Sequence, residues 1–136
     1  MLLKKIFLFG SIALLFYSCD PGATDIYEVD NQSDWKILVG YKQWNVDTAL
    51  MLEPKELKII YINNYLGVAN DELDGFLYCF DSLYINVNDT LKIGMDYLLR
   101  ENWDLKITSG KTWKGDGGTA KYKLNITNND IVRKLK

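Results

Sequence analysis

The chain has 136 residues, which is the length of one ordinary domain. It contains no histidine, so catalytic and metal sites that depend on an imidazole are excluded. The net charge of −2 gives no support for nucleic-acid binding, and we expect no cofactor.

The first 18 residues have the pattern of a secretory signal. Lys4 and Lys5 precede an uncharged apolar run over residues 6–17. As a helix this run would be about 18 Å long, too short for the roughly 30 Å hydrocarbon core of a bilayer. We therefore expect a cleaved signal peptide over residues 1–18.

The end of this run resembles the lipobox of bacterial lipoproteins, in which a cysteine is lipidated and becomes the first residue after cleavage. The matching residues are Phe16, Tyr17, Ser18 and Cys19, and the bulky pair at 16 and 17 is similar to the relaxed boxes of Bacteroidetes lipoproteins. The resemblance implies a lipid on Cys19 and an anchor in the cell envelope, at the outer membrane, with the periplasmic or surface face left open. An ordinary cleaved signal is the alternative.

Residues 19–25 are expected to form a tether, because the stretch from Asp20 to Asp25 is polar, contains Pro and Gly, and shows no periodicity. With Cys19 lipidated, Cys79 would have no disulfide partner. Cys79 lies in the apolar stretch 75–81, which predicts a strand in which this cysteine packs as a small hydrophobic residue.

Residues 26–136 alternate apolar and polar side chains, which predicts a single domain of β-strands. The expected inward-facing sets are Trp35, Ile37, Val39 and Tyr41; Leu57, Ile59 and Tyr61; Leu91, Ile93 and Met95; Trp103, Leu105 and Ile107; and Tyr122, Leu124 and Ile126. Turn residues separate these strands at intervals of roughly ten residues, which favours an all-β, antiparallel, immunoglobulin-like sandwich over βαβ units.

At most one or two short helices are expected, one within residues 95–102 and one that begins at Asn129 or Asp130. Three stretches, 29–39, 80–92 and 122–131, resemble small Bacteroidetes lipoproteins of unknown function. This resemblance implies an envelope location and carries no activity.

Two loops contain candidate ligand residues. Asn70, Glu72, Asp74 and Asp81 fall at positions of a calcium-binding loop, but the first Asp of that pattern is missing and strand-like residues follow. An acidic hairpin loop is the alternative. Residues 114–118 are rich in glycine but lack the ending of a phosphate-binding loop, so we expect a hairpin connection there.

Trp44 and Trp113 lie near predicted turns, where an exposed indole can stack on a sugar ring or a peptide. Packing at the end of the core is the alternative. Three hydroxyl residues follow an aspartate and precede an alanine or leucine: Thr48, Ser82 and Thr90. These triplets resemble the O-glycosylation sequence of exported Bacteroidetes proteins, although Asp-Ser and Asp-Thr are also common where turns lead into strands.

The sequence favours a lipid-anchored binding or structural module of the cell envelope, whose partner is a glycan or an envelope protein. One alternative is a carboxylate-based, glycan-acting enzyme, for which Asp71, Glu72 and Asp74 are the available acids. These acids share one loop, so they do not define two carboxylates on opposite sides of a cleft. Another alternative is an inhibitor or a lipoprotein of a secretion apparatus.

Overall fold

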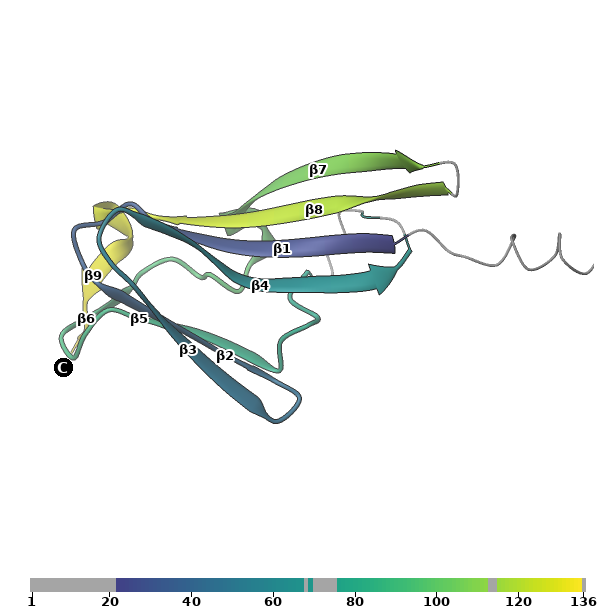
Figure 1. The fold of residues 1–136 in the computed structure, drawn as a ribbon. Coiled ribbons are helices and arrows are strands. Elements are labelled where there is room, and N and C mark those ends of the chain that lie inside the picture. Colours follow the sequence, from purple (N-terminus) through teal and green to yellow (C-terminus); the bar gives the residue numbers. More distant parts are fainter. Residues whose placement is uncertain (1–21, 68, 70–75, 113–114, 136) are drawn as a thin grey trace, which may run out of the picture.

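The computed structural model describes residues 22–67, 69, 76–112 and 115–135, with side chains described except at 109–112, 115 and 116. Two β-sheets pack against each other, so the prediction of an all-β sandwich is confirmed (Figure 1). One sheet has four strands in the order β4-β1-β8-β7, and the other has five in the order β3-β2-β5-β6-β9.

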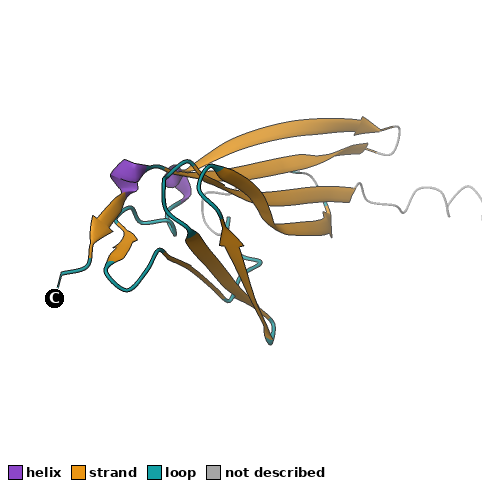
Figure 2. Cartoon of the chain, turned by 60° about the vertical axis from the view of Figure 1, so that its left-hand side comes forward, coloured by secondary structure: helices purple, strands orange, loops and turns teal. Residues whose placement is uncertain are grey.

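The described residues form nine strands and two short 3₁₀ helices. They are β1 (Gly22–Asn31), β2 (Ile37–Gln43), β3 (Val46–Leu52), β4 (Glu56–Leu66), β5 (Ser82–Asn86), β6 (Leu91–Ile93), η1 (Arg100–Asn102), β7 (Trp103–Thr112), β8 (Gly115–Ile126), η2 (Asn128–Asp130) and β9 (Ile131–Arg133). Both helices lie toward the same end of the molecule (Figure 2). The expectation of at most two short helices therefore holds for this part of the chain.

Neighbouring strands pair antiparallel, except that β1 and β8 run parallel. In an immunoglobulin domain the first strand lies at the edge of a sheet. Here β1 lies inside the four-stranded sheet, between β4 and β8. The strand order therefore differs from that of an immunoglobulin domain, although the two-layered architecture is the predicted one.

The predicted inward-facing set of β8, Tyr122, Leu124 and Ile126, is buried as expected, and from the set around β2 Ile37 and Val39 are buried while Tyr41 is partly buried. Trp35 was predicted to join the first set, but it lies in a bend before β2 and its side chain is 46% exposed. In the predicted set of β7, Trp103 is buried in the core, but Ile107 is 44% exposed, so the prediction that Ile107 faces inward is wrong.

A β-bulge in β4 reverses the predicted orientation of its first half. Tyr61 pairs with Tyr27 and Ile59 pairs with Glu28, so Ile60 is the extra residue. Ile60 is buried, while Leu57 and Ile59 are about half exposed. The prediction that Leu57, Ile59 and Tyr61 share a face is wrong, because the bulge turns two consecutive residues toward the core.

The two sheets are close at one end and diverge toward the β2–β3 turn (Figure 1). We call these the closed end and the open end. At the closed end, fully buried Asn31 joins two connections: its Nδ2 donates to the carbonyl oxygens of Trp35 (2.7 Å) and Glu53 (2.9 Å). Its Oδ1 accepts from the backbone and hydroxyl of Ser33. Asn31 therefore ties β1, the β1–β2 connection and the β3–β4 turn together.

Toward the open end, aromatic side chains from residues 76–80 fill the space between the sheets. The Phe80 ring packs edge-on against Tyr27, Tyr41 and Tyr61, with centroids 5.1–5.3 Å apart. Phe76 packs against Trp103 at 5.8 Å. The prediction of a strand over 75–81 is wrong for residues 76–79, which form a turn. Phe76 and Phe80 pack between the sheets from this turn, so their apolar character does not require strand pairing.

Both ends of the domain also differ from the sequence-based expectation. β1 begins at Gly22, and Ala23 and Asp25 are each only 2% exposed, so residues 22–25 belong to the sandwich and not to a tether.

Near the C-terminus, the Asp130 carboxylate accepts from the backbone and hydroxyl of Thr127 at 2.7 Å, and this caps η2. The expected terminal helix is wrong, because Ile131–Arg133 form β9 and pair with β6.

Candidate functional site

Trp44 is the first residue of the two-residue turn between β2 and β3, because Gln43 pairs directly with Val46. Its φ angle is 57°. This conformation costs a residue with a side chain about 1–2 kcal/mol, and hairpin turns usually place glycine there. The indole is 83% exposed, so burial does not offset this cost. A strained, exposed aromatic residue is a candidate for function.

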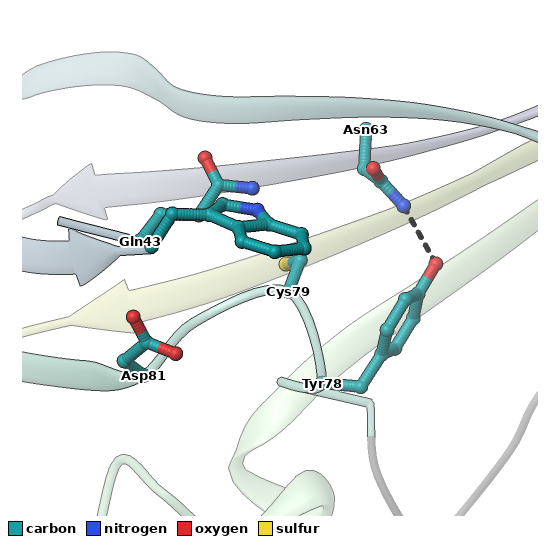
Figure 3. Close-up of a pocket in the computed structure, with 6 residues that line it drawn as sticks. Gln43, Asn63, Tyr78, Cys79 and Asp81 are labelled. Atoms are coloured by element: carbon teal, nitrogen blue, oxygen red, sulfur yellow. Dashed lines mark hydrogen bonds between the residues drawn. The ribbon is translucent and has the colours of Figure 1, made fainter. Parts of the chain in front are cut away.

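An open pocket of about 260 Å³ lies beside Trp44. It is lined by Gln43, Trp44, Asn63, Tyr78, Cys79 and Asp81. Figure 3 shows Gln43 and Asp81 on one side of the pocket and Asn63 and Tyr78 on the other, with Cys79 between them. Its volume is near the lower limit of roughly 300 Å³ for ligand pockets, which suits one ring-sized group.

Three separate parts of the chain build this pocket: β2 with its turn, the inner face of β4, and residues 78–81. Two backbone hydrogen bonds hold residues 78–81 in place. The backbone N–H of Phe80 donates to the carbonyl of Leu77 (2.9 Å), and that of Asp81 donates to the carbonyl of Lys42 (2.8 Å). The second bond fixes the Asp81 side of the pocket to β2.

Hydrogen bonds orient the polar side chains of the pocket. Asn63 Nδ2 donates to Tyr78 Oη at 2.6 Å, and Tyr78 Oη donates to the buried Asp25 carboxylate at 2.9 Å. Gln43 Nε2 donates to Tyr61 Oη. Burial, followed by the hydrogen bond to Asp25, raises the pKa of Tyr78 well above its ordinary value, so this hydroxyl keeps its proton at neutral pH.

Cys79 is a free cysteine that is partly buried and packs against the core. Burial raises the pKa of its thiol to about 11, so the thiolate needed for nucleophilic chemistry is scarce at neutral pH. This agrees with its predicted role as a small hydrophobic residue, although it lies in a turn and not in a strand.

Of the residues that the sequence predicts to bind a ligand, the structure brings Trp44 and Asp81 to the same pocket. Trp113, Asn70, Glu72 and Asp74 lie outside the described residues, as do Cys19 and the signal peptide. Within residues 22–67, 69, 76–112 and 115–135, no three acidic or cysteine side chains lie close enough to hold a metal ion. The calcium-loop hypothesis therefore stays a prediction.

The three predicted glycosylation residues do not lie together. Thr48 is half buried in β3 opposite Tyr41, and Ser82 is the exposed first residue of β5. Thr90 is exposed in the loop before β6, where its hydroxyl donates to Asn88 Oδ1 at 3.0 Å. Of the three, Ser82 and Thr90 present accessible hydroxyl groups to solvent.

The sequence did not identify Asn63, Gln43, Tyr78 or Asp25 as site residues. One pattern could have identified Asn63: in β4 it stands between Tyr61 and Tyr65 at a position that alternation assigns to the inner face. A polar amide at such a position needs a hydrogen-bond partner. Tyr78 comes from a turn that the sequence predicted as a strand, so its orientation could not be inferred.

Comparisons with family models, curated proteins and solved structures give no match for this chain. Within the described part of the chain, no helix has the length and apolar character needed to cross a membrane.

Proposed function

We propose that the protein is a lipid-anchored module of the cell envelope that binds a glycan in the pocket beside Trp44. The observation that carries the proposal is the strained and 83% exposed indole of Trp44 at the edge of a polar pocket. Sugars bind proteins through their apolar C–H faces, which stack on aromatic rings, and through hydroxyl groups, which bond to amides and carboxylates.

The lining of the pocket offers both kinds of contact. The indole of Trp44 supplies an apolar face, and the side chains of Gln43, Asn63 and Asp81 supply hydrogen-bonding groups. Because these polar residues come from different parts of the chain, they can contact several hydroxyls of one ring. This arrangement favours a binding role.

The rival function, a glycan-acting enzyme, is less well supported. Glycoside hydrolysis by carboxylates needs an acid on each side of the scissile bond. Asp81 is the one carboxylate among the six residues that line the pocket. The other acids considered for this chemistry, Asp71, Glu72 and Asp74, lie outside the described residues.

The envelope location rests on the resemblance of residues 16–19 to a lipobox. The Cys19→Ala variant should move from the membrane fraction to the soluble fraction, and the wild-type protein should carry the mass of a lipid. A Cys79→Ala variant is the matched control and should stay with the membrane. Membrane-bound Cys19→Ala protein would show that the anchor lies elsewhere.

Glycan binding is tested with the detergent-solubilised full-length protein, by affinity electrophoresis against neutral polysaccharides followed by titration calorimetry. Trp44→Ala should weaken binding about tenfold, because one aromatic contact is removed. Trp35→Ala is the control, since Trp35 is also exposed but does not line the pocket. Retention of no polysaccharide by the wild type, or equal affinity of Trp44→Ala, would refute the proposal.

A further inference from the structure

Asp25 is a buried acid directly behind the wall of the pocket. Its side chain on the inner face of β1 is 2% exposed, the lowest value for any acid whose side chain the structure describes. Removing a carboxylate from water is costly unless hydrogen bonds replace the lost solvation. Tyr78 Oη donates to one of its oxygens at 2.9 Å, and Tyr65 Oη donates to the other at 3.3 Å.

The bond to Asp25 fixes the proton of Tyr78. A phenol has a single O–H, and a carboxylate only accepts, so the Tyr78 oxygen can act only as an acceptor toward its other neighbours. The neighbour on the pocket side is Asn63, at 2.6 Å. Its amide must therefore turn the NH₂ group toward Tyr78, which leaves Oδ1 and the second N–H for a ligand.

The remaining polar groups of the pocket are mainly acceptors. Gln43 commits one N–H to Tyr61, which leaves its Oε1 and its second N–H available. Asp81 contributes an exposed carboxylate. No lysine or arginine is among the six lining residues, so the lining carries negative charge only. An anionic ligand would be repelled by the Asp81 carboxylate.

We infer that the pocket selects neutral sugar rings over acidic ones and that Asp25 is the positioning residue that sets the hydrogen-bonding direction of Tyr78 and Asn63. This inference rests on the proposed glycan binding and specifies its ligand class. A neutral pyranose brings several hydroxyl donors to these acceptors and a C–H face to Trp44. A uronic acid has the same ring but adds a carboxylate.

The test uses oligosaccharides in pairs, each neutral compound with its C6-oxidised uronic-acid form, titrated against the detergent-solubilised full-length protein. The wild type should bind a neutral compound about tenfold more tightly than its oxidised partner, as expected for one repelled charge. Asp81→Asn should reduce that ratio. Binding of neither form would refute the proposed function itself, whereas equal binding of both forms would refute only the selectivity.

Two matched tyrosine variants test the role of Asp25 without removing it. Tyr78→Phe breaks the connection between Asp25 and Asn63 and should weaken neutral-sugar binding about tenfold, the effect of one lost hydrogen bond. Tyr65→Phe removes the other phenol from Asp25 and should change affinity less than about twofold. The NMR signal of the Asn63 NH₂ group should shift in Tyr78→Phe and stay in place in Tyr65→Phe. Equal effects of both variants on affinity would show that Asp25 is structural only.

Discussion

The closed and open ends of the sandwich differ in the side chains that fill the gap between the two sheets. At the closed end, aliphatic side chains such as Ile37, Leu52 and Ile126 are fully buried, and Asn31 ties the connections together. At the open end, the sheets diverge and are bridged by aromatic rings, with the buried Asp25 behind the pocket. Positive φ angles occur in turns at both ends, at Lys55 in the β3–β4 turn and at Trp44, but it is at the open end that such a residue stands beside a pocket.

This difference shows how the fold fills a gap between the sheets that changes in width. Where the gap between the sheets is narrow, the inward-facing residues of the strands fill it. Where the gap widens, the chain inserts a turn, residues 76–79, to fill it, and the side chains of that turn become available for a pocket. Substitutions at the closed end should therefore cost the most stability, and those around the pocket the least.

Asn31→Ala should destabilise the closed end most. It leaves the carbonyls of Trp35 and Glu53 without the amide that they accept from, so the free energy of unfolding should fall by about 4 kcal/mol in chemical denaturation. Asn86→Ala, on the exposed face of β5, is the control and should change it by less than about 0.5 kcal/mol. A loss below about 1 kcal/mol in Asn31→Ala would contradict this role.

Ile60→Ala should lower the free energy of unfolding by about 3 kcal/mol, because it leaves a cavity in the core. Ile59→Ala removes the same atoms from the preceding residue, which is 48% exposed, and should cost less than about 1 kcal/mol. Thermal and urea denaturation of the pair test the bulge directly. If the two losses were equal or reversed, Ile60 would not be the inward-facing residue.

Trp44→Gly should raise the free energy of unfolding by about 1 kcal/mol, because glycine adopts a positive φ without strain. The same variant should lose ligand binding, so stability and binding would change in opposite directions. Asn45→Gly is the control, since Asn45 has no positive φ and glycine there should destabilise slightly. A loss of stability in Trp44→Gly would show that the indole supports the fold.

The smallest effect on stability is expected at Cys79, where the main expected observation is slow alkylation of the thiol. In a Cys19→Ala background, its alkylation at pH 8 should be roughly a hundredfold slower in the folded than in the unfolded protein, because the pKa is raised from 9.0 to about 11. Since folding favours the protonated thiol, its contribution to stability is present below pH 9 and is lost as the pH rises toward 11. Similar alkylation rates before and after unfolding would refute this.

The sequence predicted the architecture because most strands alternate with a clear period of two, as in β2 and β8. The prediction failed where consecutive residues are all apolar, so that the pattern does not show which of them face inward. In the run Ile59-Ile60-Tyr61-Ile62, every residue is apolar, so the position of the bulge cannot be read from the pattern. Residues 76–80 are apolar and aromatic, as in a buried strand, but residues 76–79 form a turn, and the sequence pattern does not distinguish the two.

The candidate site was only partly predictable for a related reason. Trp44 could be identified because local turn residues surround it, and turn geometry depends on nearby sequence. Asn63 and Tyr78 reach the pocket only through the packing of distant segments. The sequence predicts a tether at Asp25 because a buried acid and a solvated acid look alike in a sequence; its hydrogen bonds to Tyr65 and Tyr78 are visible in the structure alone.

The early start of β1 limits how far the domain could stand from a membrane. Only residues 20 and 21 separate Cys19 from Gly22, and three extended steps of chain span at most about 11 Å. With a lipid on Cys19, the domain would be held almost directly on the bilayer surface. Because β1 starts at the end opposite Asn31, the pocket end would face the lipid headgroups, where sugars attached to membrane components are within reach and freely diffusing polymers are less accessible.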